Sequence, residues 1–71
     1  MARRQLHTGM VTAFDDPMGL GEVTDASGVF YAFHCTAIAD GTRTIEVGSA
    51  VRFAVVAGHV GRFEADALIP A

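Results

Sequence analysis

The stretch Val51-Arg52-Phe53-Ala54-Val55-Val56 alternates large apolar side chains with others, and it is the clearest signal of the fold. Successive side chains of a β-strand point to opposite faces of a sheet, so Val51, Phe53 and Val55 share one face in that conformation. This spacing is typical of a half-buried strand. We therefore predict a strand at 49–57.

The chain on both sides of this stretch has the same character. Toward the C-terminus the sequence predicts a strand at 62–69, and toward the N-terminus it predicts strands at 6–14, 20–24 and 29–34. Turn-forming residues separate these runs, and none of the runs keeps a helical period. One face of the last strand is expected to hold Phe63, Ala65, Ala67 and Ile69, and the other Arg62, Glu64 and Asp66. Only a short helical turn is expected, near Cys35–Ala39.

Five short strands with a longer link after the third, at 36–48, indicate the all-β class and a small closed or nearly closed antiparallel barrel. Closure removes the exposed sheet edges that otherwise invite aggregation. Seventy-one residues are enough for one small domain, so we interpret 1–71 as a single domain. Residues 1–5, which include Arg3 and Arg4, are expected to form a mobile tail.

The composition bears on location and partners. The chain carries eight acidic residues, five arginines and no lysine, for a net charge of −3, so it lacks a general basic field that would attract a polyanion. A single cysteine excludes an intrachain disulfide and favours a reducing compartment. No apolar run is long enough to span a membrane, and the first residues do not read as a signal peptide. We expect a cytoplasmic protein that makes no membrane contact.

No arrangement of residues suggests catalysis, a metal site or a cofactor. His34 and Cys35 are neighbours in a predicted strand, where adjacent side chains point apart and do not readily bind one ion. His7 and His59 show no ligand spacing. Asp15-Asp16-Pro17 is interpreted as turn chemistry. The protein is therefore expected not to be an enzyme.

Several stretches resemble the cold-shock domain family. Residues 9–15 (Gly-Met-Val-Thr-Ala-Phe-Asp) are similar to its G-x-V-K-W-F-N motif, 18–23 (Met-Gly-Leu-Gly-Glu-Val) to K-G-F-G-F-I, and 31–38 (Tyr-Ala-Phe-His-Cys-Thr-Ala-Ile) to V-F-V-H-F-S-A-I. Weaker matches follow at 41–46, 51–53 and 58–65, so the resemblance covers about residues 9–69. It implies a five-stranded barrel of the oligonucleotide-binding (OB) type that binds single-stranded DNA or RNA.

The resemblance also shows which binding groups this chain lacks. The family stacks exposed aromatic rings on unpaired bases, and each stack is worth roughly 1–3 kcal/mol. The matching positions that hold no ring here are Ala13, Leu20, Glu22, Ala32, Cys35 and Thr42. Two lysine positions of the motifs hold Thr12 and Met18. Phe14 and His34 keep the family's residue types and Arg43 keeps its cationic position, so the resemblance implies that these three are the remaining contacts.

The first functional hypothesis is a small cold-shock-like protein that binds single-stranded RNA or DNA weakly. Phe30, Tyr31, Arg62 and Phe63 would supplement the remaining contacts on a displaced surface. The alternative for the aromatic residues is that Phe30, Phe33, Phe53 and Phe63 fill the core, as most phenylalanines do.

The second hypothesis is a protein-interaction or self-association module built on the same barrel. The positions that have lost rings, Ala13, Leu20, Ala32 and Cys35, would form a flat and largely apolar patch with Glu22 within it. Such a patch is closer in composition to a protein interface or a homodimer contact than to a basic nucleic-acid groove.

Overall fold

The structure is an all-β barrel with one short helical turn. A computed structural model describes residues 6–58 and 62–71, so the expected tail at 1–5 and His59 lie outside the described residues. The elements are β1 (Leu6–Asp15), β2 (Leu20–Asp25), β3 (Phe30–His34), the 3₁₀ turn η1 (Cys35–Ala37), β4 (Ala50–Ala57) and β5 (Phe63–Pro70). Each strand begins and ends within one residue of its predicted bounds, and the predicted helical turn is confirmed.

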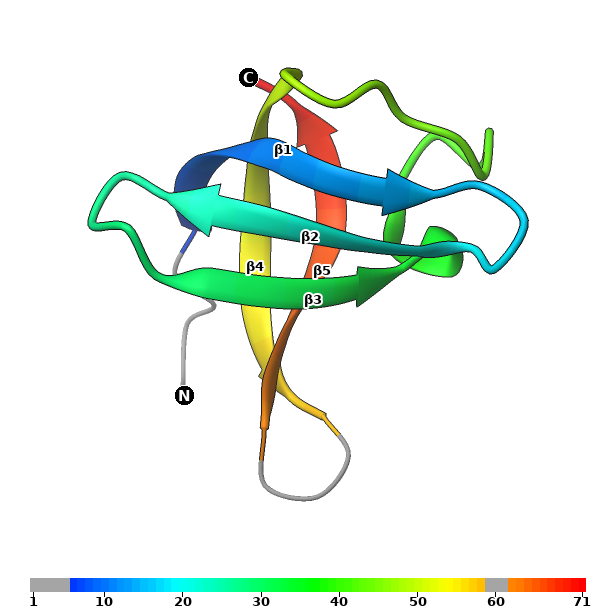
Figure 1. Cartoon of the computed structure of the whole chain (residues 1–71). Helices are drawn as coiled ribbons and strands as arrows, with labels where there is room; N and C mark the ends of the chain where they lie inside the picture. Colours follow the sequence, from blue (N-terminus) through cyan, green and yellow to red (C-terminus); the bar gives the residue numbers. More distant parts are fainter. Residues whose placement is uncertain (1–5, 59–61) are drawn as a thin grey trace.

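The five strands close into a barrel in the order β1-β2-β3-β5-β4. Strands β1, β2 and β3 form an antiparallel meander, and the β4–β5 hairpin crosses behind it (Figure 1). The barrel closes between β3 and β5, where Ala32 pairs with Glu64 in parallel. The predicted closed barrel is thus confirmed, but not all of its pairs are antiparallel. An odd number of strands cannot alternate in direction around a closed ring, so one pair must be parallel.

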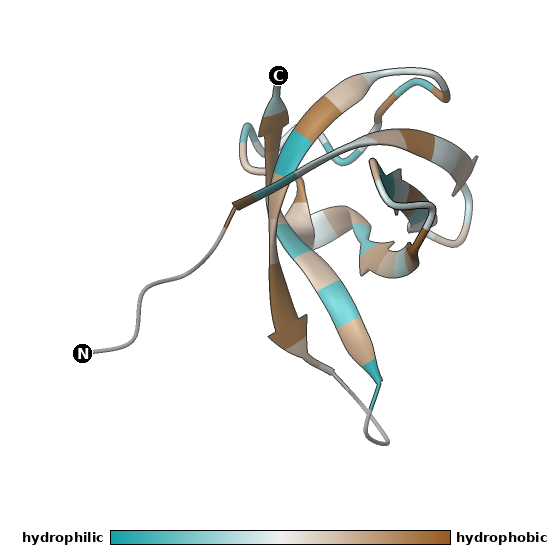
Figure 2. Ribbon diagram, turned by 90° about the vertical axis from the view of Figure 1, so that its left-hand side faces the viewer, coloured by the Kyte–Doolittle hydropathy of each residue, from teal (hydrophilic) through white to brown (hydrophobic). Residues whose placement is uncertain are grey.

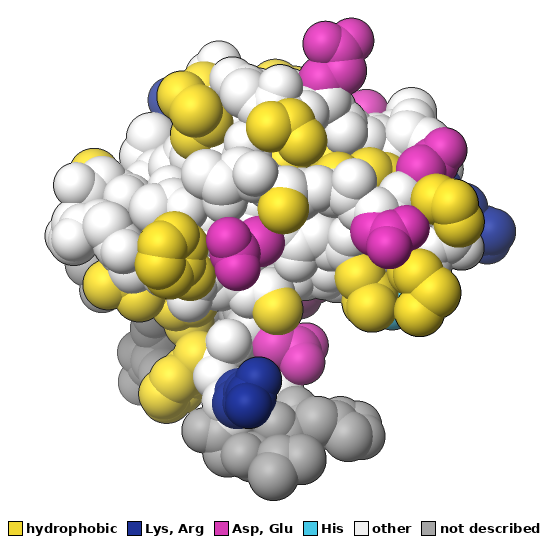
Figure 3. Space-filling model, viewed as in Figure 1, with side chains coloured by type: hydrophobic (Ala, Val, Ile, Leu, Met, Phe, Trp, Pro, Cys, Tyr) yellow, Lys and Arg dark blue, Asp and Glu magenta, His cyan; other side chains and the backbone are white. Residues whose placement is uncertain are grey.

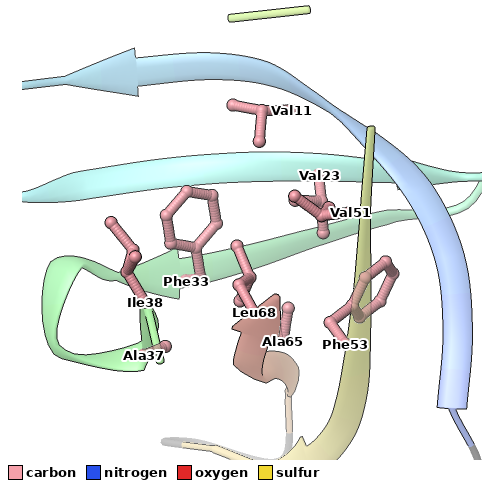
Figure 4. Packing of buried hydrophobic residues seen from close by; sticks show 9 residues of the cluster. All are labelled: Val11, Val23, Phe33, Ala37, Ile38, Val51, Phe53, Ala65 and Leu68. Carbon is pink, nitrogen blue, oxygen red and sulfur yellow. The ribbon is translucent and has the colours of Figure 1, made fainter. Parts of the chain in front are cut away.

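The core lies between the meander and the hairpin (Figure 4). It contains the buried side chains of Val11, Val23, Phe33, Ala37, Ile38, Val51, Phe53, Ala65 and Leu68. Every strand contributes to this cluster, and η1 with Ile38 covers one end of the barrel. Ile38 also forms a β-bridge to Leu68, and the Ala39 N–H donates to the Leu68 carbonyl at 2.9 Å.

Two of the four phenylalanines considered for the core are on the surface. Phe33 and Phe53 are buried, whereas Phe30 is 65% and Phe63 64% exposed, so the core interpretation is wrong for these two. Phe30 lies on the opposite face of β3 from Tyr31 and Phe33, because side chains alternate along a strand. Phe63 belongs to the part of the β4–β5 hairpin that projects beyond β3 (Figure 1), where no strand covers it.

A β-bulge changes the expected face of β5. Ala54 lies opposite Asp66 but Arg52 opposite Ile69, so β5 holds one extra residue between these pairs. Ala67 has a left-handed backbone (φ 54°) at this place. The extra residue reverses the alternation, and Leu68 is buried while Ile69 is 38% exposed. The predicted face of Phe63, Ala65, Ala67 and Ile69 is therefore wrong beyond Ala65, although β5 alternates in hydropathy along its first half (Figure 2).

Candidate nucleic-acid interface

The outward surface of β1, β2 and β3, which we call the meander face, carries the positions that match the family's motifs. Cross-strand pairing sets Ala13 beside Glu22, Glu22 beside Ala32, and Leu20 beside His34. These pairs are neighbours on one face of the sheet. The expected apolar patch is therefore assembled from Ala13, Leu20 and Ala32, with a carboxylate at its centre.

Cys35 does not complete this patch, because it begins η1 and is only partly exposed. Its sulfur packs against Gly19, where a Cβ would come within 2.8 Å of Sγ. Gly19 also has φ +65°, a conformation that residues with a Cβ rarely adopt. The Cys35 N–H donates to the Gly19 carbonyl at 2.7 Å. This contact fixes the β1–β2 turn to the end of β3.

A bulge in β1 anchors Glu22. The pairing register shifts between Val11 and Ala13, which makes Thr12 the extra residue, and both Thr12 and Ala13 are exposed. The Thr12 hydroxyl lies 3.3 Å from Oε1 of Glu22 and 3.1 Å from the hydroxyl of Thr24. The position that matches a family lysine therefore holds a hydrogen-bond donor to the carboxylate. Glu22 is thus positioned on the meander face, where it would repel a phosphate.

The same bulge turns Phe14 away from the meander face. Its ring stacks on Phe33, with 6.0 Å between the ring centroids and 11° between the planes, and it packs against the core. Phe14 also lines an open hollow. The other lining residues are Asp16, Thr44, Ile45 and Glu46. Phe14 and His34, two of the predicted contacts, therefore lie on different faces of the barrel.

His34 is exposed at the end of β3 and caps η1. Its Nδ1 accepts a hydrogen bond from the Thr36 backbone N–H at 3.3 Å, and it lies 3.1 Å from the Thr36 hydroxyl. Because Nδ1 acts as an acceptor here, the neutral imidazole carries its proton on Nε2. The ring is thus held by local backbone geometry and has a free donor atom.

The other predicted contacts lie in three places. Arg43 lies in the segment between η1 and β4, with a left-handed backbone (φ 66°). Tyr31 is partly buried and packs at 5.7 Å from Phe53 and 5.9 Å from His7, measured between ring centroids. Phe30, Arg62 and Phe63 are exposed near the junction of β3 and β5.

A tight turn precedes Arg43. Asp40 accepts hydrogen bonds at Oδ1 from the Thr42 backbone N–H (3.0 Å) and from the Thr42 hydroxyl (2.8 Å). These two bonds lower the pKa of the Asp40 carboxyl from its usual 3.8, because both favour the charged form. The bond from the Thr42 backbone has the larger effect on this pKa and the bond from the Thr42 hydroxyl the smaller. Thr42, which occupies a family aromatic position, is therefore engaged in the turn.

The charge of the meander is unfavourable for a polyanion. Residues 6–34 include Asp15, Asp16, Glu22 and Asp25 but no lysine or arginine. On the surface that the meander presents, acidic and hydrophobic side chains share the centre, and basic ones lie low in the view and at the margins (Figure 3). The cations that nucleic-acid binding needs are thus confined to other parts of the chain.

The sequence alone left open whether Phe30 and Phe63 are exposed on a displaced surface or buried in the core. Phe30 and Phe63 are the aromatic rings most open to solvent, yet neither sits at a motif position that the family uses for stacking. The signal available for Phe30 was its odd spacing from Phe33, because residues three apart face opposite ways on a strand. For Phe63 no such signal existed, because its exposure results from the length of the hairpin.

Within the residues that the structure describes, no three histidine, cysteine or acidic side chains are grouped so that they could bind a metal ion. In the same residues, no helix has the length and apolar character needed to cross a bilayer. Comparison of the chain with protein-family models and with curated proteins found no match in either case.

Proposed function

We propose that this chain is a divergent cold-shock-like domain with an OB-type barrel that binds single-stranded RNA or DNA weakly in the cytoplasm. The motif resemblance over residues 9–69 and the closed five-stranded barrel support the fold relationship. A shared fold does not transfer a binding site, so the site has to be argued from the exposed residues.

The observation that carries the proposal is the exposure of two phenylalanine rings beside an arginine. Phe30 and Phe63 are each about two-thirds exposed, and neither contributes to the core. The pairing of Ala32 with Glu64 places the α-carbons of Phe30 and Phe63 within about 15 Å of each other. Arg62 directly precedes Phe63 and is exposed. We call Phe30, Arg62 and Phe63 the hairpin-edge site.

The hairpin-edge site combines two groups that single-strand binders use, rings for stacking and a cation for the backbone. With at most about 15 Å between their α-carbons, the two rings can contact bases of one short stretch of an extended strand. Two stacks at roughly 1–3 kcal/mol each supply about 2–6 kcal/mol, and the meander carboxylates oppose binding, so we expect a Kd on the order of 100 µM or weaker. His34 extends the site along the meander face, because it lies on the same face of β3 as Phe30.

The test is fluorescence anisotropy with labelled oligo-dT and oligo-U at about 50 and 200 mM NaCl. We expect saturable binding that weakens with salt and that falls at least five-fold in Phe30→Ala, Phe63→Ala and Arg62→Gln. Met18→Ala is the matched control, because Met18 is 64% exposed but lies in the β1–β2 turn. No binding at about 1 mM protein, or equal losses in Met18→Ala, would refute the proposal.

A second candidate, a protein-interaction or self-association module, is favoured by one observation on the meander face. That face combines the apolar Ala13, Leu20 and Ala32 with carboxylates and holds no lysine or arginine. Sedimentation at two protein concentrations tests the homodimer form. A dimer that Leu20→Glu dissociates would support it, and a monomer at all concentrations would exclude it.

A further inference from the structure

The hollow beside Phe14 is separate from the hairpin-edge site. It has a volume of about 410 Å³, is open to solvent, and is lined by Phe14, Asp16, Thr44, Ile45 and Glu46. The β1–β2 turn supplies Asp16, and the segment between η1 and β4 supplies Thr44, Ile45 and Glu46. Both segments lie at the end of the meander away from Phe30 (Figure 1). A ligand here would therefore not compete with one at the hairpin-edge site.

The walls of the hollow combine a fixed aromatic ring with negative charge. Phe14 is held by its stack on Phe33, so its orientation is set before any ligand arrives. Among the described residues, the carboxylates of Asp16 and Glu46 have no hydrogen-bond or ion-pair partner. An aromatic ring and nearby carboxylates together attract a cation, and arginine or lysine is the protein group that uses both.

Two exposed apolar side chains are close in sequence to the carboxylates that line the hollow. Met18 is 64% and Val47 59% exposed, and each lies within two residues of a lining carboxylate. Asp15, at the end of β1, adds another negative charge to this end of the barrel. Arg43 precedes Thr44 but does not line the hollow. Charge complementarity thus favours a partner with positive charge, and the exposed Met18 and Val47 favour one that also carries apolar side chains.

We propose that this hollow docks a basic, partly apolar segment of another protein, with an arginine or lysine side chain entering between Phe14 and the carboxylates of Asp16 and Glu46. The apolar neighbours of that side chain pack on Met18 and Val47. This surface is separate from the hairpin-edge site. It selects a positively charged partner, whereas a nucleic acid is negatively charged.

The probe is a labelled nine-residue peptide of repeated Arg-Leu-Gly, compared with peptides in which Glu replaces every Arg or Ser replaces every Leu. We expect the first to bind with a Kd on the order of 10–100 µM and the other two at least five-fold more weakly. Glu46→Gln and Asp16→Asn each weaken binding about three-fold, the usual range for an exposed ion pair. Met18→Ala weakens it about two-fold or more.

Glu64→Gln is the matched control, because it also removes one carboxylate but lies on β5, where it pairs with Ala32 of β3 and does not line the hollow. It should leave the peptide Kd unchanged within about two-fold. If Glu64→Gln weakened peptide binding as much as Glu46→Gln does, the peptide would be attracted by the net charge of the protein alone. That result would overturn the proposal. Absence of peptide binding at about 1 mM protein would overturn it too, as would self-association that Glu46→Gln abolishes, since the occupant would then be a second copy.

The two proposals fail separately. Phe30→Ala should weaken oligonucleotide binding at least five-fold while leaving the peptide Kd unchanged, and Glu46→Gln should weaken peptide binding about three-fold without weakening oligonucleotide binding. Loss of both activities in either variant would contradict the assignment of two sites, provided that the circular dichroism spectrum of the variant is unchanged.

Discussion

The ring of Phe33 lies directly over the backbone of Gly21, its partner across β2 and β3, so that any Cβ at position 21 would overlap the far end of the ring. Phe14 then stacks on the same ring. The glycine of the Gly-Leu-Gly motif therefore determines how both aromatic side chains pack. The motif has a structural use that does not depend on nucleic-acid binding.

Gly21→Ala should destabilise the domain by about 1–3 kcal/mol, because the added methyl group must displace a packed ring. Urea unfolding measures this. Phe33→Leu in the same chain should recover at least about 1 kcal/mol relative to the sum of the single changes, since leucine leaves the space that the methyl needs. Gly28→Ala is a useful comparison, because its only cost is the positive φ. Additive effects of Gly21→Ala and Phe33→Leu would show that the contact is not tight.

The exposed and buried phenylalanines should differ sharply in their effect on stability. Phe53→Ala should cost about 3–5 kcal/mol and leave the domain close to unfolding, because the ring is fully buried. Phe30→Ala and Phe63→Ala should each change the free energy of unfolding by no more than about 0.5 kcal/mol. Thermal unfolding followed by circular dichroism distinguishes these outcomes. A large loss at position 30 or 63 would mean that the ring packs against the barrel.

The bulge in β5 offers a backbone test. Ala67 adopts φ 54°, which costs a residue with a Cβ about 1 kcal/mol or more, and glycine avoids that cost. We expect Ala67→Gly to be neutral or to stabilise by up to about 1 kcal/mol, because greater freedom of the unfolded chain offsets part of the gain. Ala67→Val should destabilise by more than about 1 kcal/mol. Ala65→Gly, at an ordinary buried position, should destabilise; if both glycine variants destabilise equally, Ala67 is not strained.

Glu22 should limit nucleic-acid affinity. Glu22→Gln keeps an oxygen that the Thr12 hydroxyl can reach but removes the charge, so we expect oligonucleotide binding to tighten about two- to five-fold at about 50 mM NaCl. The gain should shrink at higher salt, because salt screens exposed charges. Anisotropy titration with oligo-U checks this. Unchanged affinity would place the bound strand away from the meander face.

The turn at Asp40 predicts a pH effect of definite sign. Its pKa is lowered in the folded state, so its two hydrogen bonds from Thr42 contribute stability above the unfolded pKa of 3.8. That contribution disappears as the pH falls from 3.8 through the lowered folded value. A carbon-13 titration of the Asp40 carboxyl should show a midpoint below 3.8. Thr42→Val should move the midpoint up toward 3.8, and Thr42→Ser should not.

The strands could be predicted from the sequence because each is a run of apolar alternation between turn residues. Val51, Phe53 and Val55 illustrate this, since their spacing alone located β4 and its buried face. Closure into a barrel followed from the number and shortness of the strands. These properties depend on local patterns, which a sequence displays directly.

The surface could not be predicted in the same way. The bulges at Thr12 and Ala67 each insert one residue, and each changes which side chains face outward beyond it. Phe14 and Ile69 were misplaced for this reason, and a one-residue shift leaves no clear mark in the pattern. Arg43 and Arg62 match or adjoin motif positions, yet Arg43 lies in the segment between η1 and β4 and Arg62 directly precedes β5.

The parallel junction of β3 and β5 has a further consequence for dynamics. Among the described residues, Ala32 and Glu64 are its only paired position, whereas β1 and β2 pair over most of their length. Local opening should start at this seam, and amide hydrogens of β3 on the side of β5 should exchange faster than those facing β2. An oligonucleotide lying across Phe30 and Phe63 would bridge the seam from outside. Its binding should therefore slow exchange there more than anywhere else in the barrel and raise the melting temperature with ligand concentration.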